Sequence, residues 1–135
     1  MTAADAGRPV TLLVVDDNAD HRFLTKRALR PLVKAGRLRV LVAEDGEEAL
    51  ERVRDDAPAI MLLDIKMPRL DGFAVLDALR RSGHLNHMRV IMLSSSENEV
   101  DIERARKAGA HGYVIKAMDA AAFAAAVSER VTALL

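Results

Sequence analysis

The segment from Ile60 to Gly72 constrains the fold of this chain more than any other. It reads I-M-L-L-D-I-K-M-P-R-L-D-G, so an apolar run leads directly into one acid, Asp64, and a turn-forming sequence follows. A short apolar run bounded by turn residues is typical of a strand buried in a parallel sheet. The pattern therefore predicts a strand over residues 59–64 that places one carboxylate at its carboxyl end.

Short apolar runs alternate with helix-forming segments along the rest of the chain. Further strands are predicted at 11–15, 38–42, 88–93 and 112–116, and helices at 19–31, 47–53, 71–81, 98–107 and from 119 onward. This alternation predicts a doubly wound α/β domain, with a five-stranded parallel sheet and five helices on its two faces. Residues 1–9 are expected to be a disordered leader, followed by a single domain at 10–135 with no output domain.

Two helices show apolar stripes that should face the sheet. In the first helix the stripe contains Phe23, Leu24, Ala28, Leu29 and Leu32, and in the last helix it contains Phe123, Val127, Val131 and Leu134. Apolar residues at spacings of three and four indicate the buried face of a helix. We expect all of these side chains to be buried, and we expect residues 31–39 to form a long loop.

Composition limits the classes of protein to which the chain can belong. Half of its 135 residues are apolar, which is enough for one domain with a proper core. Twenty basic residues balance twenty acidic ones, so no net charge favours nucleic acid or an anionic membrane. The lack of cysteine excludes disulfides and thiolate chemistry. With neither a signal-peptide pattern nor an apolar run of membrane-spanning length, the sequence favours a cytoplasmic protein that binds no nucleic acid and no membrane.

Polar residues stand at the carboxyl ends of four predicted strands: Asp16 and Asp17, Asp64, Ser94, and Lys116. In a doubly wound sheet with strand order 2-1-3-4-5, the acids of strands one and three are neighbours at the edge where ligands bind. Taken singly, each residue could be a helix cap, a turn residue or an exposed lysine. Together, three carboxylates repel one another unless a cation holds them, and hard oxygen ligands of this kind suit Mg²⁺.

Such a cluster is complementary to phosphoryl transfer onto a carboxylate. A metal ion and an ammonium group offset the charge of the phosphoryl oxygens, a hydroxyl donates to one of them, and the acid on the buried strand attacks in line. By this reasoning Asp64 is the nucleophile.

These residues resemble the receiver domain of two-component response regulators, as found in chemotaxis receivers. The resemblance covers residues 10–135 and consists of the pair D-D, the motif D-x-x-M-P-x-x-D-G around Asp64, a hydroxyl thirty residues later and a lysine twenty-two beyond that. It implies a phosphoacceptor signalling protein, not an enzyme with a separate substrate, in which Asp64 accepts a phosphoryl group from a sensor histidine kinase. Output would follow from a changed surface on helix 4, strand 5 and helix 5.

The resemblance also implies roles for the neighbours of Asp64. Asp17, Asp64 and the backbone carbonyl of Lys66 would bind Mg²⁺, and Asp16 would assist through a water molecule. Ser94 and Lys116 would hold the phosphoryl group, while Tyr113 occupies the place of an aromatic switch. Lys66 and Ser96 are expected to modulate the lifetime of the phosphate.

Some features depart from the usual pattern of the family. Ala117 follows the lysine where the family usually has proline with a cis peptide bond, and we expect a trans bond between Lys116 and Ala117. Together with the long loop and the S-S-S sequence at 94–96, this is similar to the small regulators that accompany phytochrome-type kinases. The alanine-rich start of the last helix, A-A-A-F-A-A-A at 120–126, favours a homodimer or partner surface there.

Other functions are compatible with parts of the pattern. The chain could drain phosphate from its kinase, or relay it to a phosphotransfer protein, without an output of its own. An aspartyl-nucleophile phosphatase of the haloacid dehalogenase type would need a second acid where Lys66 stands. A flavodoxin-like flavin phosphate binder would need a Ser/Thr/Gly-rich loop where Asp16 and Asp17 stand. A degenerate receiver used as a scaffold would not need the complete set of site residues.

Overall fold

The computed structural model describes residues 7–116 and 119–135. Within them the chain forms a five-stranded parallel sheet of order β2-β1-β3-β4-β5, with five α-helices. The elements follow in the order β1 (Val10–Val15), α1 (Ala19–Lys34), β2 (Leu38–Ala43), α2 (Gly46–Asp56), β3 (Ile60–Asp64), α3 (Gly72–Ser82), the 3₁₀ turn η2 (His84–His87), β4 (Arg89–Ser94), α4 (Glu99–Lys107), β5 (Gly112–Ile115) and α5 (Ala120–Leu134). The predicted fold class and strand order are confirmed.

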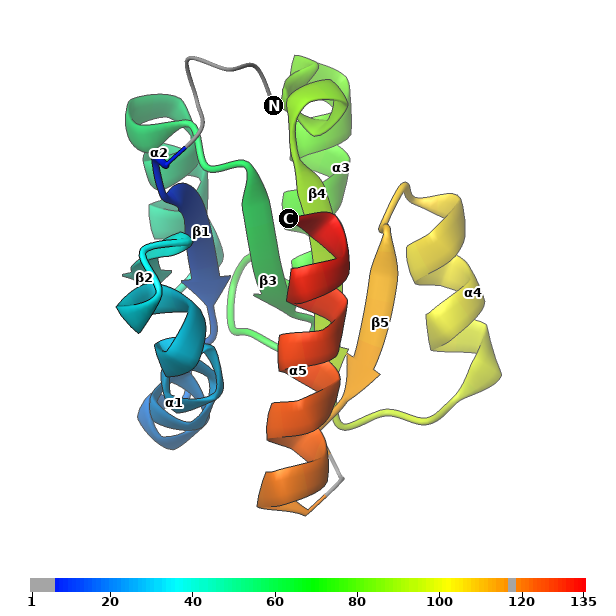
Figure 1. The fold of residues 1–135 in the computed structure, drawn as a ribbon. Coiled ribbons are helices and arrows are strands. Elements are labelled where there is room, and N and C mark those ends of the chain that lie inside the picture. The colour runs from blue at the N-terminus through cyan, green and yellow to red at the C-terminus, as the bar shows by residue number, and fades with distance from the viewer. Residues whose placement is uncertain (1–6, 117–118) are drawn as a thin grey trace.

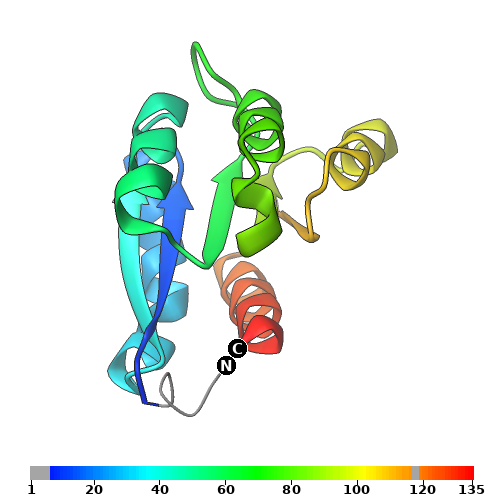
Figure 2. The same cartoon turned by 90° about the horizontal axis from the view of Figure 1, so that it is seen from above.

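Alternate side chains of the central strands build two separate cores, because successive residues of a strand point to opposite faces. Leu13, Met61 and Leu63 belong to the core shared with α2, α3 and α4. Leu12 and Leu62 belong to the core shared with α1 and α5. Figures 1 and 2 show this arrangement, with α3 and α5 on opposite sides of the sheet. Strand β3 is buried along its whole length, as its unbroken apolar run predicts.

Helix α1 is longer than the sequence suggested. It continues through Pro31 to Lys34, so the prediction of a helix end at 31 and a long loop over 31–39 was wrong. Proline lacks only the N–H that would bond backwards, while its carbonyl still accepts from the backbone N–H of Ala35 at 3.0 Å. Leu29 belongs to the core shared by α1 and α5, and Leu32 packs against the same core, which keeps the end of α1 in place.

Two predicted core residues lie at the surface. Phe23 is 59% exposed, because the buried stripe of α1 runs through Thr25, Ala28 and Leu29, and Phe23 lies about 200° round the helix from Thr25. Leu134, at the last residue of α5, is 37% exposed, whereas Phe123, Val127 and Val131 are buried as expected.

Residues 1–6 of the predicted leader lie outside the described residues, as do residues 117 and 118, so the predicted trans bond after Lys116 does too. Within residues 7–116 and 119–135, no helix combines the length and the apolar character needed to cross a membrane.

Candidate functional site

Three carboxylates meet at the carboxyl edge of the sheet. Strands β1 and β3 pair in parallel, with Val15 opposite Leu63, so the residues that follow them come together. One ligand oxygen from each of Asp16, Asp17 and Asp64 lies within 4.8 Å of the others. Asp16 and Asp64 are buried, and Asp17 is exposed. The acid cluster predicted from the strand ends is therefore present, with one open side.

Asp16 is held by protein donors on both carboxylate oxygens. The backbone N–H of Asn18 donates to Oδ1 at 2.9 Å, and the ammonium of Lys116 donates to Oδ2 at 2.5 Å. The guanidinium of Arg22 donates to the backbone carbonyl of Asp16 at 2.8 Å. Asn18 also caps α1, since its side chain accepts from the N–H of His21. These bonds fix the turn between β1 and α1 and leave Asp17 as the exposed acid.

Asp64 is a buried carboxylate in an unfavourable electrostatic setting. Burial raises its pKa from the ordinary value of 3.8 to about 6; the ammonium of Lys116 opposes this rise, and the charges of Asp16 and Asp17 add to it. Lys116 Nζ lies 3.3 Å from Asp64 Oδ1. One lysine therefore leaves part of the negative charge of three acids uncompensated, which is the situation that a divalent cation relieves.

Gly72 lets the start of α3 close over the backbone of Asp64. A Cβ atom at this position would lie 2.4 Å from the carbonyl oxygen of Asp64 and 2.8 Å from the Cα of Ile65. The N–H of Gly72 donates to the carbonyl of Ile65 at 2.8 Å, and Asp71 caps the helix by accepting from the N–H of Ala74. The D-G pair of the motif thus has a mechanical role: it packs α3 against the strand end that carries the candidate nucleophile.

Three hydroxyl-bearing residues from β4, β5 and the loop after β4 are linked by hydrogen bonds through Ser96. Ser94 is buried, and its Oγ accepts from the N–H of Ser96 at 3.0 Å. The hydroxyl of Ser96 donates to Asp101 of α4 at 2.8 Å, and the hydroxyl of Tyr113 donates to the carbonyl of Ser96 at 3.0 Å. The structure therefore connects the three predicted residues Ser94, Ser96 and Tyr113 through one loop to helix α4.

Lys116 reaches the acid cluster from the end of β5. Its backbone N–H donates to the carbonyl of Ser94 at 2.7 Å, which places the residue beside β4. Its side chain is only 7% exposed and contacts Asp16, Asp64 and His21. The lysine thus enters the site although the residue after it is not proline, and its closest acidic partner is Asp16 and not Asp64.

Lys66 lies on the open side of the cluster. Its side chain is exposed, and it lines a shallow depression of about 530 Å³ with Asp17, Asp71, Asp101 and Arg104. Arg104 of α4 also lies over the ring of Phe73 of α3, 4.0 Å from its centroid. The predicted roles of the Lys66 carbonyl and side chain remain predictions.

Besides Arg22, two further residues contact the site but were not predicted from the sequence, His21 and Asp101. His21, in the first turn of α1, accepts from Lys116 at Nδ1 over 3.1 Å, and Asp101 accepts from Ser96. His21 and Lys116 are 95 residues apart, and no local pattern marks a histidine at this helix position. Asp101 reads as an ordinary acid in the first turn of α4, where acids favour the helix dipole.

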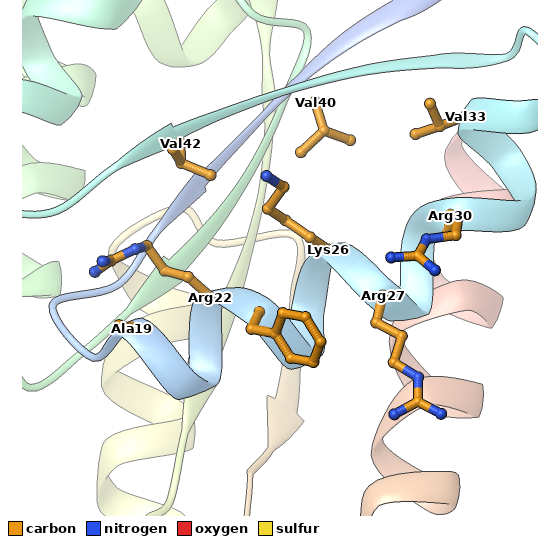
Figure 3. Close-up of a pocket in the computed structure, with 9 residues that line it drawn as sticks. Ala19, Arg22, Lys26, Arg27, Arg30, Val33, Val40 and Val42 are labelled. Carbon is orange, nitrogen blue, oxygen red and sulfur yellow. The ribbon is translucent and has the colours of Figure 1, made fainter.

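A basic groove lies between α1 and the edge strand β2, outside the acid cluster. It has a volume of about 490 Å³, and its lining includes Val33, Val40 and Val42 together with the cations Arg22, Lys26, Arg27 and Arg30 (Figure 3). The exposed ring of Phe23 belongs to the same surface. Arg22 pairs with Glu44 at 3.4 Å and also bonds to the backbone of Asp16, so it links this surface to the turn of the acid cluster.

Comparison with known proteins assigns the family. Residues 12–128 match the family model described as the response regulator receiver domain. The chain belongs to this family. Receiver domains are phosphoacceptor signalling domains that take a phosphoryl group on an aspartate, and response regulators interact with histidine kinases and downstream effectors.

Three relatives illustrate the range of this receiver domain. It is 34% identical over 118 residues to the probable methanogenesis regulatory protein FilR2 of Methanothrix harundinacea, covering 83% of this chain and 75% of FilR2. It resembles the phosphorylated cyanobacterial phytochrome response regulator RcpA, with a TM-score of 0.80, 26% identity and coverage of 90% and 91%. The Mn²⁺-bound form of the response regulator Rcp1 has the same fold, with a TM-score of 0.82, 22% identity and coverage of 94% and 95%.

Proposed function

We propose that this receiver domain accepts a phosphoryl group on Asp64 from a sensor histidine kinase, in a Mg²⁺-dependent reaction, and signals through a changed surface on α4, β5 and α5. One observation carries the proposal: Asp64 is buried at the end of β3, with the carboxylates of Asp16 and Asp17 and the ammonium of Lys116 gathered around it. This constellation has the nucleophile, the metal ligands and the cation that phosphoryl transfer requires.

The donor set fits a hard divalent cation. Three carboxylate oxygens lie within 4.8 Å of one another. The pKa of Asp64 is raised mainly by burial, and the charges of Asp16 and Asp17 add to this rise. A divalent cation would favour the ionised form of such a buried carboxylate. Asp17 and Asp64, with the backbone carbonyl of Lys66, would hold Mg²⁺ directly, and Asp16 would act through water because Asn18 and Lys116 already donate to it. The ion would supply neutralisation of the charge on the phosphoryl oxygens.

In the proposed chemical step, the nucleophile and the hydrogen-bond donors all come from groups that line the site. A carboxylate oxygen of Asp64 attacks the phosphorus of a phosphohistidine; a P–O bond forms, the P–N bond breaks, and the electron pair returns to the imidazole nitrogen. Lys116 and the hydroxyl of Ser94 donate hydrogen bonds to the phosphoryl oxygens. The signal ends by hydrolysis: the oxygen of a water molecule attacks phosphorus, the P–O bond to Asp64 breaks with its electron pair returning to the carboxylate, and inorganic phosphate leaves. The exposed Lys66 and the hydroxyl of Ser96 stand at the rim, where they would modulate this hydrolysis.

The output surface is supported by how weakly α4 is anchored. Among the residues of α4 only Ala105 is buried, and Val100 is 72% exposed. A Ser94 hydroxyl drawn toward the phosphoryl group would release the Ser96 N–H, and Ser96 holds both Tyr113 and Asp101. We therefore propose that phosphorylation shifts α4 and favours a homodimer or a partner complex through α4, β5 and α5. A mass by light scattering that stays monomeric at all concentrations, with and without phosphodonor, would contradict the dimer.

The proposed kinase is of the phytochrome type, and the support is the likeness to RcpA, whose description names it a phytochrome response regulator. The test is a competition of purified, autophosphorylated histidine kinases for this receiver. Preferential phosphotransfer from a phytochrome-type kinase supports the partner. Equal or faster transfer from unrelated kinases contradicts it, while leaving Asp64 as the acceptor.

The central experiment is labelling with a small phosphodonor. The protein is incubated with acetyl phosphate and Mg²⁺, and the base-labile phosphate is located by mass spectrometry. Labelling is expected on Asp64, lost in Asp64→Asn and kept in the control Asp55→Asn, which removes an exposed acid at the end of α2. The proposal fails if the wild type is not labelled or if Asp64→Asn is labelled equally. Catalytic turnover of a simple phosphate ester would instead favour the aspartyl phosphatase.

A further inference from the structure

The ammonium of Lys116 is hydrogen-bonded to Asp16 and to His21, and it forms an ion pair with Asp64. Its Nζ lies 2.5 Å from Asp16 Oδ2, 3.3 Å from Asp64 Oδ1 and 3.1 Å from Nδ1 of His21. An ammonium group has three N–H bonds and accepts no hydrogen bond, so each of its N–H groups can point to a different neighbour. His21 therefore completes the set of hydrogen bonds that orient a nearly buried lysine.

The chemistry of this contact fixes the role of each ring nitrogen. Since the lysine can only donate, Nδ1 of His21 must be the accepting nitrogen, and the ring proton is on Nε2. The side chain of His21 is 44% exposed, and its Nδ1 also lies 3.9 Å from Oδ2 of Asp16.

The backbone holds His21 firmly in this place. Its N–H donates to the Oδ1 of the cap residue Asn18 at 3.0 Å, and its carbonyl accepts from the hydroxyl of the buried Thr25 at 2.9 Å. His21 and Lys116 also line a small cavity of about 110 Å³ with Leu24, Ala120 and Phe123, where α1 and α5 approach each other. The histidine is therefore mounted on a rigid first turn, next to the lysine side chain.

We propose that His21 is a positioning residue for the phosphorylation of Asp64: it accepts one hydrogen bond from Lys116 and so directs another N–H of the ammonium toward Asp64. This inference rests on the proposed function. Hydrogen bonds to Asp16 and His21 occupy two N–H groups on the α1 side. One N–H group is left for Asp64, whose Oδ1 lies 3.3 Å from Nζ. When Asp64 carries a phosphoryl group, this remaining N–H group of Lys116 can donate a hydrogen bond to a phosphoryl oxygen.

The test compares variants that keep or remove the acceptor. His21→Asn places a carbonyl oxygen near the position of Nδ1, whereas His21→Phe keeps the ring and removes the acceptor. Labelling of Asp64 by acetyl phosphate with Mg²⁺ should slow by about 3- to 10-fold in His21→Phe and stay close to wild type in His21→Asn. The control His87→Phe changes an exposed histidine of η2 and should have no effect. His21→Ala serves as a second acceptor-free variant should the phenylalanine disturb folding, which circular dichroism reports.

A double-mutant comparison separates positioning from general damage. In the background Lys116→Ala, His21→Phe should slow labelling no further, because the histidine acts through the lysine. Equal rates for wild type and His21→Phe, failure of His21→Asn to restore the rate, or a full additional loss in the Lys116→Ala background would each overturn the inference. If wild-type Asp64 is not labelled at all, the proposed function itself has failed, which is a different result.

Discussion

The two halves of the site differ in how they are built. The acid half, formed by Asp16, Asp17 and Asp64, follows two adjacent central strands and rests on continuous cores on both faces of the sheet. The hydroxyl half, formed by Ser94, Ser96 and Tyr113, leads to α4, in which only Ala105 is buried. The acid half carries several negative charges close together but is held in place by packing on both faces of the sheet. The hydroxyl half is uncharged and packs weakly. This division suits a switch whose chemistry stays in place while its surface moves.

The largest effect should follow from removing the exposed acid of the acid half. Asp17→Asn deletes a proposed metal ligand without disturbing the core, since this side chain is exposed. Loss of hydrogen-bonded neighbours of a metal site costs about 10- to 100-fold in affinity, so loss of a ligand should cost at least this much in Mg²⁺-dependent labelling of Asp64. Tyr113→Phe in the hydroxyl half should label at nearly the wild-type rate. Equal losses in both variants would remove the distinction between the halves.

A smaller effect is expected on the free energy of unfolding, from removing the buried negative charge of Asp64. Asp64→Asn should raise the free energy of unfolding at pH 7.5 by roughly 1 to 3 kcal/mol, because the pKa of the buried carboxyl is raised to about 6 in the folded state from an ordinary 3.8. The folded protein then binds this proton more tightly than the unfolded chain, so the wild type gains stability as the pH falls from about 6 to about 4. The difference between the two proteins should vanish near pH 4.

Urea unfolding at a series of pH values checks this sign. Subtracting the two proteins cancels other groups, such as His111, whose pKa is lowered by burial and which acts in the opposite direction. A pH-independent difference would show that the buried charge of Asp64 has no such effect. Added Mg²⁺ should stabilise the wild type and much less the variant, because the ion binds the ionised carboxylates.

The smallest effect belongs to the hydroxyl half. Tyr113→Phe removes the hydroxyl that donates to the carbonyl of Ser96, at a cost of about 0.5 to 1.5 kcal/mol. The loss should appear locally, as faster hydrogen exchange of the backbone amides in the loop after β4 and in α4. Exchange in β1 and β3 should stay unchanged. Uniformly faster exchange would mean that the two halves open together and not separately.

The central parts of the fold and the site could be predicted from the sequence because their signals are local. Each strand is a short apolar run, and the residue just after it is delivered to one edge, so Asp16, Asp64, Ser94 and Lys116 were brought together by strand order alone. The hydrogen-bond partners were less accessible. That Lys116 binds Asp16 more closely than Asp64 depends on side-chain packing at the end of β5.

The errors came from places where tertiary contacts outweigh a local rule. Proline usually ends a helix, but Pro31 costs α1 only one backbone bond, and core contacts lie on both sides of it, at Leu29 before and at Leu32 after the proline. Phe23 was assigned to the core as part of the apolar stripe of the first helix. Thr25 takes the buried place instead, because its hydroxyl bonds to the backbone carbonyl of His21 within α1. His21 could not be found because its partner is 95 residues away.

Gly72 should influence the pattern of tolerated substitutions in a mutational scan of this protein. It contributes no functional group, yet any side chain there would meet the backbone of Asp64 and Ile65. In a complete substitution library scored by signalling, we therefore expect position 72 to tolerate as few substitutions as Asp64, the proposed phosphoacceptor. Even alanine should be excluded at position 72. A map of essential positions would mark it as part of the reactive centre, although its contribution is the space that it leaves empty.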